Sequence, residues 1–493
     1  MQIGDLIRRA GRQFGDAPAI VTPSRSVSFA EFDRATDRLG NALLALGLVP
    51  GDRVAVAMPN GIDGVVVYYA LAKAGLVRVP LNVRETPAEH TYKIDDSQSR
   101  GYVFTGEPAT DVDVMIRAAE LDRLVADASD TPCDVRRGPH EPFRLAYTGG
   151  TTGKPKAVVL TTASELAEVA NFLVDLVPNL SPTSAMLHAA PITHGSGAFF
   201  LPHLVKGAPS IVLEKFTPAD FLEAARKYKA TNTFMVPTMI SMLLEHPDTA
   251  TAELHLERLC WGGAPMATTL LQRGIDTLGP IFAQLYGQAE APLAITCLQP
   301  WEHTPERLAS AGKPYTFVEV DVRDSDNRSL PAGGVGEVVT RGPHTMREYW
   351  RRPEATAETI DPDGWLHTGD LGRLDSDGYL YLMDRRHDVI ISGGFNVYPR
   401  EVEDVLLSHP AVLEAAVVGI ADDHWGERVS AAVVVRTTVT AEELTEHCTT
   451  RLAGFKRPRH IEFWDTLPTS PVGKSLRREV RDRMSTEKET THV

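Results

Sequence analysis

The chain has 493 residues, which predicts more than one domain and provides ample length for a large hydrophobic core. Its formal net charge of −15 argues against nonspecific nucleic-acid binding, which needs a basic surface. The N-terminus lacks a signal-peptide core, the apolar window 64–81 is broken by Lys73 and Arg78, and the four cysteines have no metal-type spacing. We therefore expect a cytoplasmic protein with free thiols and no membrane span.

The first 144 residues are predicted to alternate between helices and strands. Apolar side chains recur at helical spacing across 28–47, which predicts an amphipathic helix. A buried strand is expected at 54–58, a helix at 65–74 and a second strand at 76–80. Strand–helix–strand alternation favours a parallel sheet and an α/β fold.

Residues 145–160 read LAYTGGTTGKPKAVVL, two apolar runs around a loop rich in Gly, Thr and Lys. Glycines let main-chain N–H groups approach an anion, while the Thr hydroxyls and Lys charges suit phosphates. Pro155 ends any helix after Lys154, so this is not the common P-loop. We predict a strand–loop–strand polyphosphate clamp, with a flexible hairpin as the alternative. The residues assigned to the clamp are Thr148, Gly149, Gly150, Thr151, Thr152, Gly153, Lys154 and Lys156.

The same stretch resembles the signature of the adenylate-forming superfamily, which contains acyl- and aryl-CoA synthetases, peptide-synthetase adenylation domains and beetle luciferases. Its one departure is Ala157, where Gly is usual. Further family motifs follow in order, so the resemblance covers about residues 15–480. It implies a large N-terminal AMP-binding domain of layered sheets and helices (1–385) and a small mobile α+β lid domain (386–493).

Two segments resemble the family's substrate pocket. His194, in the segment PITHG, matches a residue that lies beside the substrate carboxylate. The segment WGGAP contains three small residues in a row, whose lack of side-chain volume would let a flat ring lie against the backbone. The resemblance assigns Gly263, Ala264 and Pro265 to adenine or to an aryl substrate.

Three further motifs imply contacts to ATP and Mg²⁺. In QLYGQAE, Tyr286 and Gly287 would lie near adenine and Glu290 would hold Mg²⁺, although Ala289 stands where the family's Thr offers a hydroxyl. In WLHTGD, the matching residue Asp370 would bind the ribose hydroxyls. Arg385, fifteen residues further on, would bind ribose or phosphate.

The C-terminal part resembles the family's lid. His387 takes the place of the hinge residue, which is usually Asp or Lys. Gly393, Gly394 and Phe395 belong to a loop that lines the pantetheine tunnel of CoA ligases. The motif PTSPVGK would present Lys474 to the carboxylate and the α-phosphate.

The resemblance therefore implies an ATP-dependent, AMP-forming acid–thiol ligase that most resembles a free-standing acyl- or aryl-CoA ligase. Its ligands would be ATP, Mg²⁺, a small carboxylic acid and CoA, with catalysis by Lys474, His194 and Glu290. Four alternatives stay open: transfer to a carrier protein or an amine, activation of another oxyanion, a luciferase-like oxidation, and a nonenzymatic nucleotide-binding protein. Retention of Lys474, Glu290 and Asp370 argues against the last. The sequence does not predict whether the acid is aryl or medium-chain aliphatic. It does not predict the oligomeric state either, for which a homodimer is one option.

Overall fold

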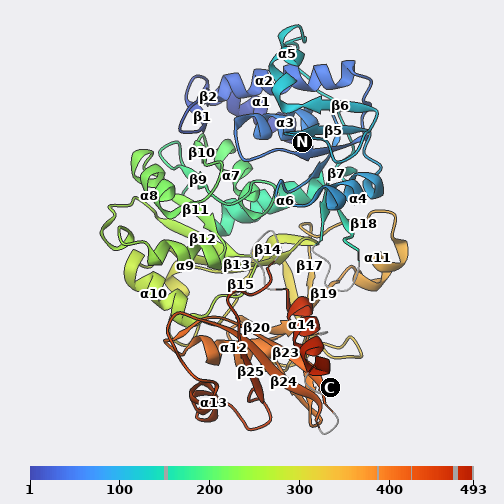
Figure 1. The fold of residues 1–493 in the computed structure, drawn as a ribbon. Helices are drawn as coiled ribbons and strands as arrows, with labels where there is room; N and C mark the ends of the chain where they lie inside the picture. Colours follow the sequence, from blue (N-terminus) through green and yellow to red (C-terminus); the bar gives the residue numbers. More distant parts are fainter. Residues whose placement is uncertain (149–153, 386–387, 423–424, 470–475, 491–493) are drawn as a thin grey trace.

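The computed structural model describes residues 1–148, 154–385, 388–422, 425–469 and 476–490. It is a mixed α/β protein with two large sheets, a four-stranded sheet and a separate C-terminal sheet (Figure 1). Among the described residues, no helix is long and apolar enough to cross a membrane. The four cysteines are buried and unpaired, as expected.

The seven-stranded sheet carries the predicted strand–helix–strand alternation. Its central strands are parallel, because α3 (Ile62–Lys73) returns the chain between two of them. In spatial order the strands are β18 (Glu348–Tyr349), β8 (Ala157–Thr161), β7 (Pro142–Tyr147), β4 (Val77–Pro80), β3 (Arg53–Ala57), β5 (Gly101–Phe104) and β6 (Val114–Arg117). Strand β8 is antiparallel to β7 on one side and to β18 on the other, which puts a hairpin and then a short strand at this edge.

The nine-stranded sheet combines strands from residues 186–314 with two strands from residues 18–28. In spatial order its strands are β15 (Lys313–Pro314), β14 (Ala291–Leu298), β13 (Phe282–Gln288), β12 (Arg258–Gly262), β11 (Asn232–Met235), β9 (Met186–His188), β10 (Ser210–Val212), β1 (Pro18–Val21) and β2 (Ser26–Ser28). The helices that pack against it with a shared apolar core are α8 (Pro218–Lys227), α9 (Pro237–Glu245) and α10 (Thr268–Leu278).

A helical layer separates the two large sheets (Figure 1). Helix α6 (Thr162–Asn171) contacts β8 of one sheet and β14 of the other, so it lies between them. The predicted helix at 28–47 is confirmed as α2 (Phe29–Ala45). Ser28 and Glu31 cap it reciprocally, since each side chain accepts a hydrogen bond from the other's main-chain N–H, at 3.2 and 2.8 Å. The other helices of the N-terminal region are α1 (Ile3–Phe14), α4 (Pro87–Ser97), α5 (Leu121–Ala126) and α7 (Phe200–Val205).

Two smaller sheets complete the molecule. The four-stranded sheet has the order β16 (Glu319–Arg323), β17 (Gly336–Arg341), β19 (Leu366–Leu374) and β20 (Leu380–Arg385), and α11 (Pro353–Thr359) precedes β19. The C-terminal sheet has the order β22 (Phe395–Val397), β21 (Ile390–Ser392), β24 (Gly426–Val435) and β23 (Val412–Asp422), with β25 (His460–Phe463) also paired to β24.

The C-terminal sheet has an apolar core on each face. On one face Val417, Val429 and Val433 pack against α12 (Pro399–Leu407) and α13 (Ala441–Thr449). On the other, Val418 and Ala432 pack with Val480 of α14 (Arg477–Thr490). All of its strands follow residue 387, which agrees with the proposed boundary at 385/386; that boundary stays a prediction.

Candidate active site

Tyr286, Asp370 and Arg385 meet although they come from three strands of two sheets. Asp370 and Arg385 are opposite each other in the antiparallel register of β19 and β20. The Tyr286 hydroxyl donates to Asp370 Oδ2 at 2.7 Å, and Arg385 Nε lies 3.5 Å from Asp370 Oδ1. Burial and the Asp370 charge raise the pKa of Tyr286 well above its usual value, so its phenol stays a donor. The arrangement fixes a carboxylate that can accept hydrogen bonds from ligand hydroxyls.

The predicted strand–loop–strand arrangement is confirmed by the hairpin of β7 and β8. Across its mouth the Thr148 N–H donates to the Lys156 carbonyl at 3.0 Å, and the Lys156 N–H donates to Thr148 Oγ1 at 3.3 Å. Helix α4 braces the second side, because the Tyr92 hydroxyl donates to the Pro155 carbonyl at 2.8 Å and the Lys154 ammonium lies 5.4 Å from the Tyr92 ring centre. The clamp residues Gly149, Gly150, Thr151, Thr152 and Gly153 lie outside the described residues.

Glu290 lies beside this hairpin, just after β13, with 8% of its surface exposed. Its Oε1 accepts a hydrogen bond of 2.5 Å from the hydroxyl of Tyr349 in β18. The Lys156 ammonium lies 4.2 Å from the centre of the Tyr349 ring. Burial and the Glu290 charge raise the pKa of Tyr349. The sequence analysis missed Tyr349. The available signal was the aromatic pair in the run REYWRRP, ahead of WLHTGD.

The site fits a metal shared between protein and ligand. Within the part of the chain that the structure describes, no group of three or more His, Cys, Asp or Glu side chains could hold a metal ion. Mg²⁺ takes oxygen ligands and is usually bound through one or two carboxylates together with substrate phosphates. A single buried carboxylate next to a phosphate-type hairpin matches that pattern, and Glu290 is the residue that could supply it.

His194 stands exposed at the start of a 3₁₀ turn, Gly195–Phe199, in the layer between the large sheets. Its Nδ1 lies 2.8 Å from the Thr193 hydroxyl. Two residues of the turn point into the core: Phe199 is fully buried, and the Ser196 hydroxyl is 2.8 Å from the buried His188 ring. The turn is thus anchored on its inner side, which leaves His194 on the outer side.

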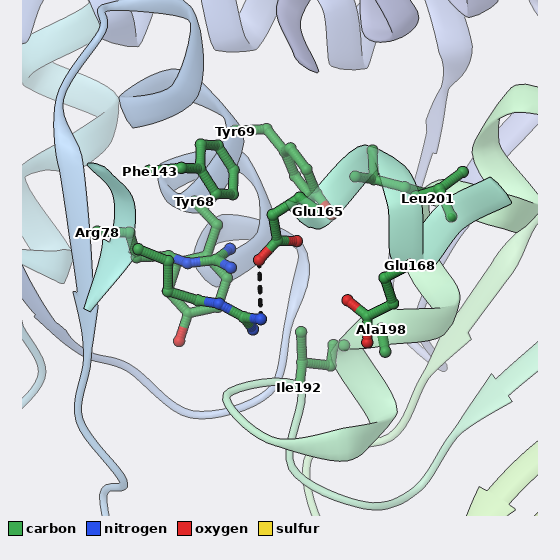
Figure 2. A pocket seen from close by; sticks show the side chains of 12 residues that line it. Tyr68, Tyr69, Arg78, Phe143, Glu165, Glu168, Ile192, Ala198 and Leu201 are labelled. Carbon is green, nitrogen blue, oxygen red and sulfur yellow. Dashed lines mark ion pairs between the residues drawn. The ribbon is translucent and has the colours of Figure 1, made fainter. Parts of the chain in front are cut away.

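A small polar cavity of about 20 Å³ adjoins this turn at Gly197 and Ala198 (Figure 2). Arg144 pairs with Glu165 at 2.8 Å in its wall, while Glu168 Oε1 is buried with no hydrogen-bond partner. Burial and the neighbouring Glu165 charge raise the pKa of Glu168 to about 8. The cavity has room for about one water molecule, so we regard it as a hydrated part of the core.

The small residues expected near a flat ring have local structural causes. A Cβ on Gly262, the last residue of β12, would lie 2.4 Å from the Leu285 carbonyl oxygen. Gly263 has φ +81°, and a Cβ built there meets no atom of the described residues within 4 Å, apart from those of Gly263 and its two chain neighbours. Ala264 is half-buried and Pro265 is exposed. A Cβ on Gly287 would lie 2.3 Å from the Leu293 nitrogen, so the bulge between β13 and β14 requires glycine.

In the C-terminal sheet, Gly393 and Gly394 form the turn between β21 and β22, with φ of +59° and +82°. Phe395 follows, 57% exposed, and stacks on Phe455 at 4.6 Å between ring centres. His387 and Lys474 lie outside the described residues. The segment that carries Lys474 is flanked by a hydrogen bond of 2.9 Å from the Leu476 N–H to the Pro468 carbonyl.

A phosphate-type hairpin beside one buried carboxylate, with a hydroxyl-accepting carboxylate nearby, defines a nucleotide-dependent activating enzyme. The model of the AMP-binding enzyme family matches residues 7–350, and the model of the AMP-binding enzyme C-terminal domain matches residues 401–474. The chain therefore belongs to the AMP-binding enzyme family, the adenylate-forming enzymes. The predicted resemblance, the α/β fold class and the assignment as an ATP-dependent, AMP-forming ligase are confirmed.

Relatives extend over nearly the whole chain. It is 39% identical over 490 residues to a feruloyl-CoA synthase from Amycolatopsis sp, covering 97% of this chain and 98% of that protein. It is 36% identical to a fatty acid–[acyl-carrier-protein] ligase, ScoC, from Streptomyces coeruleorubidus, covering 94% and 93%. The ATP-bound crystal structure of MatB from Rhodopseudomonas palustris superposes with a TM-score of 0.90 at 28% identity, covering 98% and 99%.

Proposed function

We propose that this ligase activates a carboxylic acid as an acyl-adenylate with release of pyrophosphate, and then transfers the acyl group to the thiol of CoA. One observation supports this most: Asp370 and Glu290 are two separate carboxylates, each held by its own hydrogen-bonding partner, to which we assign the ribose and the metal–phosphate ends of ATP. Tyr286 and Arg385 hold the first, and Tyr349 holds the second. The feruloyl-CoA synthase relative supports CoA as the acceptor.

In the first step a carboxylate oxygen attacks the α-phosphorus of ATP. An O–P bond forms, the bond from the α-phosphorus to the bridging oxygen breaks, and pyrophosphate leaves. We assign the β- and γ-phosphates to the loop residues Thr148, Gly149, Gly150, Thr151, Thr152, Gly153, Lys154 and Lys156. We assign the ribose to Asp370 and Arg385, and the adenine to Tyr286, Gly287 and Gly263–Pro265. Mg²⁺, when bound, would neutralise charge on the phosphate oxygens, and Glu290 would hold it.

His194 and Lys474 complete this assignment. We place the acid's carboxylate beside His194, which is exposed on its turn. Lys474 would bridge that carboxylate and the α-phosphate, so catalysis rests on positioning and electrostatics. In the second step the CoA sulfur attacks the acyl carbon, the thiol loses its proton and AMP leaves. We assign His387 as the hinge for the lid movement between the steps, and Gly393, Gly394 and Phe395 to the thiol's path.

The acid itself is a narrower proposal. The relatives act, by name, on feruloyl and fatty acyl groups, and the open space at Gly263 suits a flat ring. We therefore expect an aryl acid or a medium-chain fatty acid. The cytoplasm is the expected location, because four buried free thiols suit a reducing compartment.

The test is pyrophosphate release against a panel of aryl, short, medium and long acids, each with and without CoA. Release with one class, together with AMP and a thioester formed only with CoA, supports the proposal and names the acid. Release that ignores CoA would reject CoA as acceptor, and the ScoC relative makes a carrier protein the next acceptor to add. Bound ATP without pyrophosphate release from any acid would reject acid activation.

A further inference from the structure

Tyr349 is fixed at the edge of the seven-stranded sheet by main-chain pairing with the strand that leaves the phosphate hairpin. It lies opposite Val158 in the register of β18 and β8. On either side of it, the Arg347 N–H donates to the Val159 carbonyl at 3.0 Å and the Trp350 N–H donates to the Ala157 carbonyl at 2.8 Å. Its position is therefore tied to β8 and, through it, to the hairpin.

The segment that carries Tyr349 also holds Glu290 at two points. The Met346 N–H donates to the Glu290 carbonyl at 2.7 Å, and the Tyr349 hydroxyl donates to Glu290 Oε1 at 2.5 Å. Tyr349 is 5% exposed and Glu290 8%, so this hydrogen bond is largely shielded from water. Hydrogen bonds to an ionised acceptor are stronger than neutral ones, and both partners here have little room to rotate away.

The ring of Tyr349 contacts a positive charge, whereas its hydroxyl contacts the negative charge of Glu290. The Lys156 ammonium lies 4.2 Å from the ring centre, within the range of a cation–π interaction. Among the residues that the structure describes, no ion pair joins Lys156 to Glu290. One side chain thus contacts an ammonium with its ring face and a carboxylate with its hydroxyl.

We propose that Tyr349 is a positioning residue for the metal–phosphate end of the nucleotide site. Its hydroxyl engages Glu290 Oε1 and leaves Oε2 for Mg²⁺, while its ring keeps Lys156 directed toward phosphate. This inference rests on the proposed function, because it takes MgATP as the ligand. It predicts two separable effects, since the hydroxyl serves the metal and the ring serves the phosphate.

The test uses the full chain and equilibrium ATP binding, measured by calorimetry over a series of Mg²⁺ concentrations without any acid substrate. Tyr349→Phe keeps the ring and removes the hydroxyl. It should raise the Mg²⁺ concentration for half-maximal ATP binding by about tenfold, the scale of one hydrogen bond to a charged group, and leave ATP binding in EDTA unchanged. Tyr349→Leu removes the ring as well and should also weaken binding in EDTA.

The matched control is Tyr379→Phe. Tyr379 is 3% exposed and donates to the Glu302 carboxylate at 2.8 Å, but it lies outside the proposed site. This variant should leave the Mg²⁺ dependence at the wild-type value. If Tyr349→Phe and Tyr379→Phe have the same Mg²⁺ dependence, the positioning role is wrong. Wild-type protein that binds no ATP at any Mg²⁺ concentration would instead reject the proposed function.

A double variant tests the link between Tyr349 and Glu290 from the carboxylate side. Its reference is Glu290→Gln instead of the wild type. If the hydroxyl acts only through Glu290, then Tyr349→Phe added to Glu290→Gln should shift the Mg²⁺ dependence no further than Glu290→Gln does. Full additivity of the two changes would overturn the inference.

Discussion

Arg477 lies 2.5 Å from Asp384, which joins the first residue of the last helix to the last strand before residue 386. The same guanidinium reaches Glu403 of α12 at 2.7 Å and Asp388 at 3.3 Å. Arg385, next to Asp384, contacts Asp370 of the proposed ribose site. The start of α14, three residues after Lys474, is therefore linked to the strand that carries Arg385 through one cation, whose side chain is 18% exposed.

Arg477→Ala should destabilise the protein strongly. It leaves the buried carboxylates of Asp384 and Glu403 without their cation, and breaking a buried ion pair from one side costs about 3–5 kcal/mol. Thermal unfolding followed by scanning fluorimetry measures the effect. Arg478→Ala is the control, because its pair with Asp482 spans 3.9 Å between side chains that are 71% and 68% exposed. Equal shifts for both variants would contradict the linking role.

Glu168→Gln should flatten the fall of stability with pH. The folded-state pKa of Glu168, about 8, lies above the ordinary value of 4.5, so the folded protein binds this proton more tightly than the unfolded chain. Its contribution is therefore fully present below about pH 4.5 and is lost as the pH rises to about 8. Gln cannot ionise, so melting temperatures across this range should fall less steeply than in the wild type.

The control for that experiment is Glu354→Gln, a change at an exposed position in the first turn of α11. It should leave the wild-type pH profile unaltered. A Glu168→Gln profile parallel to wild type would mean that Glu168 is already ionised in the folded protein.

Asp370→Asn should weaken ATP binding, because it removes the charge that we propose accepts the ribose hydroxyls. Hydrogen bonds to charged groups contribute about 1.5–3 kcal/mol, or about tenfold or more in affinity. The diagnostic ligand is 2′,3′-dideoxy-ATP, which the wild type should bind more weakly than ATP and the variant about equally. Tyr286→Phe removes only the donor to Asp370 and should give a smaller loss. If Asp370→Asn still discriminates fully between the two nucleotides, another residue binds the ribose.

Lys474→Ala should raise the barrier for adenylate formation by roughly 2.7–4 kcal/mol, the scale for removing one preorganised charge-stabilising donor. It should spare thioester formation from a preformed acyl-adenylate. Pyrophosphate release reports the first step, and thioester yield from synthetic adenylate reports the second. Comparable losses in both steps would remove the role assigned to Lys474.

Local patterns in the sequence were enough to predict the elements with clear periodicity. The helix at 28–47 and the parallel strands near 54–58 and 76–80 appear close to their expected bounds. After the hairpin, α6 (Thr162–Asn171) continues into a π-helical turn at Phe172–Leu176. A change of hydrogen-bonding pattern within a continuous helical run leaves the apolar spacing almost unaltered, so the sequence did not reveal it.

Contacts between residues far apart in the sequence were harder to predict from local patterns. That Tyr286, Asp370 and Arg385 meet was expected only from the resemblance, because 84 residues separate the first two. Tyr349 was missed because β18 has only two residues, too few for a periodic pattern, and its partner β8 lies far back in the chain. The buried Glu168, whose Oε1 has no hydrogen-bond partner, was missed because helical spacing marks a buried position but not what surrounds it.

The two apolar cores of the C-terminal sheet affect what a change in its position relative to the rest of the protein would cost. Its strands are closed on one face by α12 and α13 and on the other by α14, so its hydrophobic surface is satisfied internally. Turning such a unit against a new surface would break polar contacts such as Arg477–Asp384 without exposing an apolar face to water. A change in the placement of this unit would therefore be opposed mainly by the loss of polar contacts and not by the loss of its own hydrophobic burial.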